Sequence, residues 1–203
     1  MTDFLPAQRR LLAAGYDIGT ADGIAGPRTW TAILAYVGKR PMASTALLGE
    51  AAAKTLPHYG IATRQRIANF IGQAAHETGG FRILREIWGP TDAQRRYEGR
   101  ADLGNVRAGD GYRYRGRGIF QITGRANYDA IGAALGLDLE ETPKLVESPP
   151  VAVETACYFW QSRGLNELAD AGDEDKITRR INGGNNGLSE RRALVDRAKG
   201  LFA

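Results

Sequence analysis

His76-Glu77-Thr78-Gly79-Gly80 is the stretch that decides the fold, because it ends a long amphipathic segment and places a carboxyl group at that end. The spacing upstream is helical, and the chain after Thr63 carries apolar residues at Ile67, Phe70, Ile71, Ala74 and Ala75. This pattern predicts a helix that turns one apolar stripe toward a core and ends near the two glycines.

Glu77 lies in the last turn of this predicted helix, on or beside the apolar stripe. Partial burial and the negative end of the helix dipole both favour the protonated form of its carboxyl group. A carboxylic acid that stays protonated near neutral pH can donate its proton to the oxygen of a glycosidic bond. Glu77 is therefore the candidate general acid.

A second candidate carboxylate is Glu98, in Arg95-Arg96-Tyr97-Glu98-Gly99-Arg100. The three arginines of this segment favour its charged form, which a base acting on water requires. A glutamate among arginines is also commonly a plain surface charge or half of an ion pair. Asp102 and Asp110 remain alternatives for the base.

Further motifs follow in a fixed order: Tyr97-Glu98-Gly99-Arg100, Tyr112 to Gly118, Gln121-Ile122-Thr123-Gly124 and Ile181-Asn182-Gly183-Gly184. Together with the His-Glu-Thr motif, they resemble the family 19 glycoside hydrolases, the chitinase-like enzymes that include many bacteriophage endolysins. The resemblance covers roughly residue 43 to the C-terminus. It implies an all-α fold, with a lysozyme-like or chitinase-like domain of two helical lobes over residues 41–203.

The resemblance also implies roles for single residues. Glu77 matches the proton donor and Glu98 the acid that activates water. Thr123 stands where plant members usually carry a serine that holds this water, and it keeps the hydroxyl group. The family inverts the anomeric carbon, so we expect the two carboxyl groups to be about 6.5 to 9.5 Å apart.

Contacts with sugar are expected from a further set of side chains in the cleft. His76 can hydrogen-bond there or anchor the helix end. Tyr112 and Tyr114 lie in a loop rich in glycine and arginine, predicted from Gly99 to Gly118, and can stack on sugar rings or anchor the loop. The substrate-binding residues expected are His76 and Tyr112 and, because the resemblance implies them, Gln121, Asn127, Tyr128 and Asn182.

The N-terminal segment carries a weaker resemblance, to the small helical peptidoglycan-binding module of many wall hydrolases. It rests on Asp22-Gly23-Ile24-Ala25-Gly26-Pro27-Arg28-Thr29, in which Gly26 and Pro27 are turn and helix-start signals. We expect residues 1–40 to form this module. Because domains of about 40 residues rarely fold unaided, it should pack on the catalytic part, or be simply a helical hairpin that covers the core.

The remaining chain reads as helical. Helices are expected from Ser44 to Leu56, over Asn127 to Leu135, from Pro149 through Trp160, over Asp173 to Ile181, and from Ser189 as N-cap to Phe202.

Composition excludes several classes of protein. The chain has 203 residues, 43% of them hydrophobic, and a net charge of +4, which suits one main domain and a small one. No apolar run has the length of a membrane span, and the first residues lack the layout of a signal peptide. The basic excess suits anionic peptidoglycan or an anionic outer-membrane surface, and no nucleic-acid motif accompanies it.

Metal and cofactor chemistry is not indicated. The only histidines are His58 and His76, and no zinc-protease motif follows His76. Gly116-Arg117-Gly118 lacks the third glycine of a dinucleotide fingerprint. The single cysteine, Cys157, lies in an apolar run and is expected to be a buried small hydrophobe that forms no intramolecular disulfide. No metal and no cofactor is expected.

The resemblance leaves a main hypothesis and several alternatives. The main one is an endolysin that hydrolyses β-1,4 bonds of bacterial peptidoglycan with two carboxyl groups. We expect it to be monomeric, made in the host cytoplasm without a signal peptide, and to reach the wall through a holin. The alternatives are a bacterial chitinase, a non-catalytic wall-binding protein, and a lytic transglycosylase, which uses one glutamate and is disfavoured by the second carboxylate.

Overall fold

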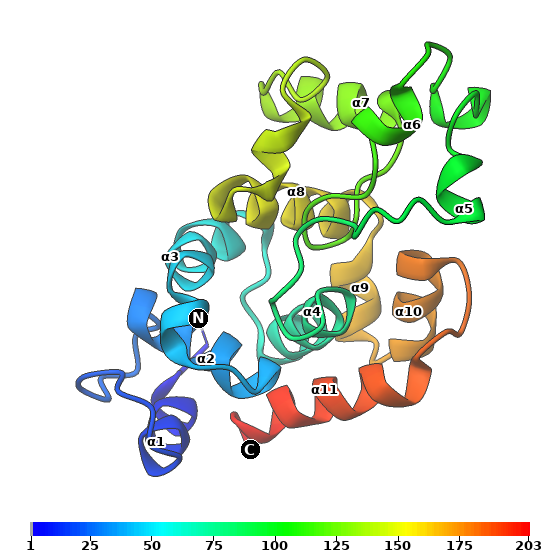
Figure 1. Ribbon diagram of the computed structural model, residues 1–203. Helices are drawn as coiled ribbons and strands as arrows, with labels where there is room; N and C mark the ends of the chain where they lie inside the picture. Colours follow the sequence, from blue (N-terminus) through cyan, green and yellow to red (C-terminus); the bar gives the residue numbers. More distant parts are fainter. Residues whose placement is uncertain (1) are drawn as a thin grey trace. The chain divides into compact units, whose positions relative to one another are not determined.

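The computed structural model describes residues 2–203 and is built almost entirely from helices, as expected (Figure 1). The longer α-helices are α1 Leu5–Ala13, α2 Pro27–Gly38, α3 Ala46–Thr55, α4 Arg64–Glu77, α7 Arg125–Leu135, α8 Pro149–Ser162, α10 Glu174–Asn182 and α11 Leu188–Gly200. Shorter helices are α5 Asp92–Arg95, α6 Asp110–Arg113 and α9 Leu165–Asp170, with 3-10 turns η1 Met42–Ser44, η2 Leu56–Tyr59, η3 Ala101–Leu103 and η4 Pro143–Glu147. Extended pairing among the described residues is limited to the bridges Arg85–Arg117 and Arg117–Ile122.

The chain forms two compact units. Unit 1 runs up to Arg82 and resumes over Cys157–Ala203, and unit 2 is the continuous segment Ile83–Ala156. Unit 1 therefore contains α1 to α4 and α9 to α11, and unit 2 contains α5 to α7. Helix α8 begins in unit 2 and ends in unit 1.

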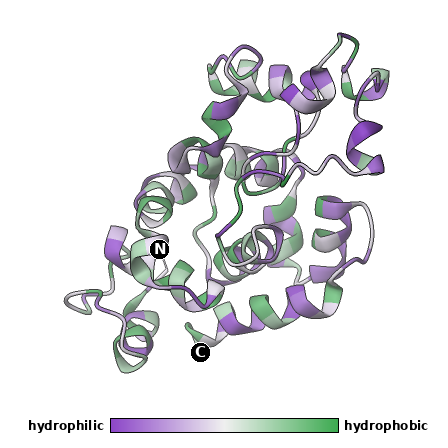
Figure 2. Cartoon of the chain, viewed as in Figure 1, coloured by the Kyte–Doolittle hydropathy of each residue, from purple (hydrophilic) through white to green (hydrophobic). Residues whose placement is uncertain are grey.

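Unit 1 is organised around α4, the helix predicted from the opening motif. Thr63 caps its start by accepting a hydrogen bond from the Arg66 amide, and the helix ends at Glu77 as expected. Helix α11 carries both apolar and polar residues along its length, as Figure 2 shows, and packs against α4. The two helices approach closely at Gly72, where a Cβ atom would lie 2.5 Å from Val195 Cγ2 and 2.7 Å from the Val195 nitrogen. A larger residue does not fit at that crossing.

The N-terminal segment packs within unit 1. The Phe4 ring makes edge contacts with Trp30 and with Phe202, at centroid distances of 5.6 and 5.7 Å. Arg197 of α11 donates to the Tyr36 carbonyl and lies over the Tyr36 ring. Residues 2–40 thus share their core with the C-terminal helix, as their small size led us to expect.

Buried Gln8 explains the N-terminal turn motif. Its amide nitrogen donates to Asp22, to the Ile24 carbonyl and to Thr29, and its amide oxygen accepts from the Gly23 amide. Pro27 opens α2 in the first turn, as its position predicted. The motif is therefore accounted for by the fold of the segment, and its function as a wall-binding module stays a prediction.

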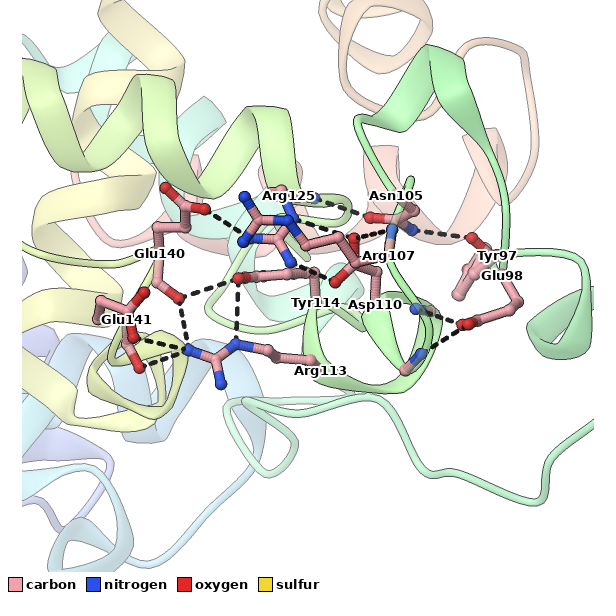
Figure 3. Close-up of polar contacts among 12 residues, drawn as sticks. Tyr97, Glu98, Asn105, Arg107, Asp110, Arg113, Tyr114, Arg125, Glu140 and Glu141 are labelled. Atoms are coloured by element: carbon pink, nitrogen blue, oxygen red, sulfur yellow. Dashed lines mark hydrogen bonds and ion pairs between the residues drawn. The ribbon is translucent and has the colours of Figure 1, made fainter.

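Unit 2 has its own small core, formed by Tyr114, Ile122, Tyr128, Leu139 and Val146. Polar contacts surround this core. Arg125 pairs with Asp110 and Glu140, and its guanidinium lies 4.7 Å from the centre of the Tyr114 ring (Figure 3). These contacts stiffen a unit that has few long helices.

Two details differ from the sequence-based expectations. The segment from Gly99 to Gly118 is not a structureless loop, because it contains η3 and α6. Ser189 is not the N-cap of α11, since the helix starts at Leu188 and Gly187 occupies the cap with φ of +69°. The remaining predicted helices correspond to α3, α7, α8 and α10, with ends shifted by a few residues.

Residues 2–203 contain no helix with the length and apolar character needed to cross a membrane. Within the same residues, no three or more His, Cys, Asp or Glu side chains gather as a metal site would require.

Candidate active site

The end of α4 holds the first candidate residues, in unit 1. Thr78 donates from its hydroxyl to the Ala74 carbonyl at 2.6 Å and accepts from the Phe81 amide at 2.8 Å. Phe81 has a positive φ of 62° and is buried, so the chain turns sharply after the helix. This turn fixes the last helical residues, His76 and Glu77, at a well-defined helix end.

Glu77 forms an ion pair with Arg191 of α11. Arg191 Nη2 donates to Glu77 Oε1 at 2.5 Å, and Arg191 Nη1 donates to Gln73 Oε1 at 2.7 Å. Gln73 in turn donates to the Thr178 hydroxyl at 3.1 Å. The Arg191 side chain is 4% exposed and that of Glu77 19%, so a buried cation orients the partly buried carboxyl group. The protonated state of Glu77 was expected without knowledge of this cation, and it stays a prediction.

His76 lies beside Glu77 and is half-buried. A Cβ atom at Gly187 would lie 2.5 Å from His76 Cε1, so the ring packs on the start of α11. Burial lowers the pKa of His76, and the charge of Arg191 lowers it further. A neutral, packed ring fits the expected role of anchoring the helix end, and contact with sugar remains a prediction.

Asn182 organises the turn between α10 and α11. Its amide nitrogen donates to the Asn186 carbonyl at 2.9 Å, and its oxygen accepts from the Gly184 amide at 2.8 Å. Arg191 Nε also donates to the Asn186 carbonyl, at 3.2 Å. The Asn-Gly-Gly motif therefore holds the turn that meets Arg191, and the expected contact of Asn182 with sugar stays a prediction.

Glu98, the second candidate acid, lies in unit 2 and is engaged by the backbone. Its two carboxylate oxygens accept from the amides of Gly109 and Gly111, at 2.6 and 2.8 Å (Figure 3). The arginines of its motif bind elsewhere, since Arg95 pairs with Asp92 and Arg100 with Asp102. Two of the three arginines of the motif are thus engaged with other carboxylates, and the expected support of the Glu98 charge stays a prediction. Glu98 closes the segment that leads to α6.

The two alternative bases named from the sequence, Asp102 and Asp110, both form ion pairs with arginines. Asp110 is buried and paired with Arg125, whose hydrogen bond is the main cause that lowers the pKa of Asp110. Asp102 is exposed and paired with Arg100. Both carboxylates are therefore held by arginines, and we do not assign either of them as the base.

A different carboxylate, Glu86, has the surroundings of a catalytic group. Glu86 Oε2 accepts from the Gly116 amide at 3.0 Å, and Oε1 accepts from Gln94 Nε2 at 3.0 Å. Burial, followed by the charge of Glu86 and a hydrogen bond to it, raises the pKa of Tyr97. Three donors therefore surround a carboxylate that remains half-buried.

Thr123 and Gln121 lie on the same side of Gly116 as Glu86. A Cβ atom at Gly116 would lie 2.6 Å from Gln121 Oε1, 3.3 Å from Glu86 Oε2 and 3.4 Å from Thr123 Oγ1. The Thr123 hydroxyl donates to the Gln121 carbonyl at 3.0 Å. Gln121 has a positive φ of 49°, a costly conformation for a residue with a side chain. The Gln121 amide nitrogen donates to the Gly118 carbonyl at 2.8 Å, so it is the amide oxygen of Gln121 that lies, with the Thr123 hydroxyl and the Glu86 carboxylate, around one point beside Gly116.

The other residues expected to bind sugar differ in exposure. Tyr112 is 53% exposed and its ring contacts Trp88 edge-on. Asn127 is exposed and donates to the Thr123 carbonyl at 2.6 Å. Tyr128 is fully buried, and its hydroxyl donates to the Arg115 carbonyl and accepts from Arg117. Tyr128 therefore supports the arginine-rich segment from within the core, which is at odds with its expected contact with sugar.

Two residues of the site could not be predicted from the sequence. Arg191 is 114 positions from Glu77 in the sequence, so no local pattern joins them. Glu86 lies in a segment without helical periodicity, and none of the motifs quoted from the sequence contains it. Its proximity to Thr123 depends on the bridges that bring residue 117 next to residues 85 and 122.

Carboxyl groups held beside amide and hydroxyl side chains in an all-helical fold fit the class of glycoside hydrolases, which cleave their substrates with a pair of carboxyl groups. Residues 43–171 match the profile of glycoside hydrolase family 19, described as chitinase class I. The chain belongs to this family, and it is a glycoside hydrolase acting on O-glycosyl bonds.

Relatives and solved structures agree with this assignment. A glycosyl hydrolase family 19 domain-containing protein of Haemophilus influenzae is 33% identical over 159 residues, covering 65% of this chain and 78% of that protein. An acidic 27 kDa endochitinase of Solanum lycopersicum is 37% identical over 125 residues, covering 58% of this chain and 47% of that protein. The crystal structure of chitinase C from Streptomyces griseus has the same fold, with a TM-score of 0.68 at 24% identity, over 85% of this chain and 91% of that one.

Proposed function

We propose that this protein hydrolyses β-1,4 bonds between the amino sugars of bacterial peptidoglycan, with Glu77 as acid and Glu86 as base. The observation that carries the catalytic assignment is the convergence of Glu86, Gln121 and Thr123 on one point beside Gly116. A carboxylate, an amide and a hydroxyl in this arrangement can hold and activate a water molecule.

In the proposed reaction, Glu77 donates its proton to the oxygen of the breaking glycosidic bond. A water molecule held by Thr123 and Gln121 gives a proton to Glu86, and its oxygen forms the new bond to the anomeric carbon. The products are two shorter glycans, one of them with a new reducing end of inverted configuration. Arg191 acts through Glu77, by fixing the direction of its carboxyl group.

Glu86 replaces Glu98 as the proposed base for a geometric reason. Both oxygens of Glu98 accept backbone amides of the Gly109–Gly111 turn, so its carboxylate is used to close that turn. Glu86 lies beside Thr123, the residue expected to hold the water. We therefore assign Glu98 a structural function in unit 2.

Peptidoglycan is the preferred substrate because of the N-terminal resemblance to wall-binding modules and the basic net charge. In this proposal the protein is a phage endolysin that is made in the host cytoplasm and released by a holin to the wall. Chitin is the second candidate substrate. Similarity to plant proteins named endochitinases favours chitin, and the glycosidic bond in chitin is chemically similar to that in peptidoglycan.

The test is mass spectrometry of the products released from purified peptidoglycan and from chitin. Wild-type protein should release muropeptides with reducing ends from the wall, and NMR of the first products should show the inverted anomer. Glu77→Gln and Glu86→Gln should each lower the rate by at least about 100-fold, the scale of general acid-base catalysis. Glu98→Gln is the matched control and should retain more activity than Glu86→Gln.

Each outcome bears on a separate part of the proposal. Chitin oligomers without muropeptides would make this protein a chitinase. Anhydro products would indicate a transglycosylase, and full activity of Glu86→Gln would return the base to Glu98. No product from either polymer would leave a wall-binding protein.

A further inference from the structure

Unit 2 contains a pocket of about 390 Å³ on its arginine-rich segment. This volume lies within the range of small-ligand sites. The pocket is formed where the segment before the Gly116 turn meets η4, and its lining residues are Tyr112, Arg113, Arg115, Arg117, Glu141, Thr142, Pro143 and Lys144.

The charges of this pocket do not balance. Arg117 pairs with Glu147 at 2.7 Å, and Arg113 pairs with Glu141 at 3.3 Å (Figure 3 shows the second pair). Arg115 and Lys144 form no ion pair with any residue among 2–203. Two positive charges of the lining therefore lack a negative partner within the chain as described.

Arg115 is the more unusual of the two, because it is only 5% exposed. Its Nη1 donates to the Tyr112 carbonyl at 2.8 Å, and its guanidinium lies 4.1 Å from the centre of the Tyr112 ring. Its Nε is buried without a hydrogen-bond partner. Burial lowers the pKa of Arg115, and the charge of Arg117 lowers it further. An unpaired buried cation is costly, and an anion bound nearby offsets that cost.

Tyr112 and Lys144 add the features of a sugar site. Tyr112 is 53% exposed, and the Arg115 guanidinium lies over one face of its ring, so the ring is held in place while part of the residue stays accessible. Lys144 is exposed at the rim of the pocket and can reach a ligand with its ammonium group. A ring that stacks on a sugar thus lies beside two uncompensated positive charges.

We propose that this pocket binds a carboxylate carried by the glycan, and so favours peptidoglycan strands over neutral chitin. This carboxylate is the free lactyl group in muramyl residues that lack a peptide, and a carboxylate of the peptide stem where the lactyl group is amide-linked. The inference rests on the proposed hydrolysis of amino-sugar polymers. Lys144 contacts the carboxylate, Arg115 supplies buried positive charge, and Tyr112 packs on the sugar. The same chemistry occurs in the carboxylates of the peptide stems, so the test separates the two sources.

The first experiment compares kcat/KM on three substrates: intact peptidoglycan, strands stripped of peptides by an amidase, and chitohexaose. The ratio of stripped strands to chitohexaose should fall roughly tenfold in Lys144→Gln, mainly through KM, because one charge contact is lost from the bound state. Arg115→Gln should lower the same ratio. If this buried substitution prevents folding, the Lys144→Gln result alone tests the pocket. Arg96→Gln, which removes an exposed charge of unit 2 outside the pocket, should leave the ratio unchanged.

The second experiment needs no turnover. Titration of the wild-type protein with N-acetylmuramic acid, followed by NMR, should shift signals of Arg115 and Lys144, and N-acetylglucosamine should not. If Lys144→Gln lowers kcat/KM on intact wall and leaves it unchanged on stripped strands, the bound carboxylate belongs to the peptide stem. Equal losses of kcat/KM on all three substrates in Lys144→Gln would overturn the proposed carboxylate site. Equal NMR shifts with N-acetylmuramic acid and N-acetylglucosamine would overturn it as well. A wild-type protein that cleaves none of them would refute the proposed function, while the titration would still decide the pocket.

Discussion

At the scale of single residues, the candidate acid depends on one distant partner. Arg191 is almost fully buried and donates to Glu77 and Gln73 at once. Arg191→Leu leaves the Glu77 carboxyl without its cation and Gln73 without a donor. We expect a loss of about 3 kcal/mol in the free energy of unfolding, as for other buried pairs that lose one partner. Chemical denaturation measures this loss.

The activity of the same variant separates positioning from folding. At a temperature where Arg191→Leu is still folded, kcat should fall more than KM rises, because the misdirected Glu77 acts in the transition state. Arg191→Lys should restore part of the stability but less of the rate, since an ammonium group cannot reproduce the two-pronged contact. Unchanged kcat in the Leu variant would remove Arg191 from the catalytic argument.

His76 gives the protein a dependence of stability on pH. Its folded pKa lies below the ordinary value of 6.5, so the unfolded chain binds more protons in the window between the two values. Stability should therefore fall as pH decreases from 6.5 toward the folded pKa. The melting temperature of wild-type protein between pH 7.5 and 5 should drop more than that of His76→Gln. Parallel curves for the two proteins would show that burial of this ring does not matter.

At the scale of elements, the crossing of α4 and α11 has no room at Gly72. A methyl group there would meet Val195 Cγ2 and the backbone nitrogen of α11. Gly72→Ala should destabilise unit 1 by about 1 to 3 kcal/mol, the usual cost of overpacking. Gly200→Ala is the matched control, because nothing lies within 4 Å of that site and alanine favours a helix. A lower melting temperature for Gly200→Ala than for Gly72→Ala would contradict the packing argument.

The turn around Gly116 is limited by its neighbours in a different way. A methyl group at this position would enter the space shared by Gln121, Glu86 and Thr123. Gly116→Ala should lower kcat by roughly 100-fold, because small displacements of catalytic groups have large effects on rate. Its melting temperature should change less than that of Gly72→Ala. A folded variant with normal kcat would show that this space is not used in catalysis.

Helices with strong periodicity could be predicted from the sequence, and contacts across the chain could not. The apolar stripe before Glu77 and the glycines after it indicated α4 correctly. Ser189 was wrongly taken as a cap because a serine is a good cap, whereas the His76 ring leaves space only for glycine at residue 187. Glu86 was missed since its neighbours come from a turn 30 residues further on.

At the scale of the whole molecule, the first 40 residues are part of a shared core. Phe4 packs with Trp30 and with Phe202, and Tyr36 contacts Arg197. A chain that begins at Pro41 loses these contacts and exposes the apolar residues they cover. We expect its melting temperature to fall by at least about 10 °C, given roughly 2 to 4 °C per kcal/mol for a protein of this size. Unchanged stability and activity would instead support a separable wall-binding module.

The interruption of unit 1 by unit 2 has a consequence for synthesis on the ribosome. Residues 83–156 form one continuous unit, so every residue that takes part in its internal contacts has been made once residue 156 leaves the exit tunnel. The first 82 residues must wait much longer, because α11 covers α4 only after the last 16 residues of the chain emerge. Until then the apolar stripe of α4 is open to proteases and to aggregation. A chain that stops before α11 lacks Arg191 and therefore cannot form the ion pair that orients Glu77.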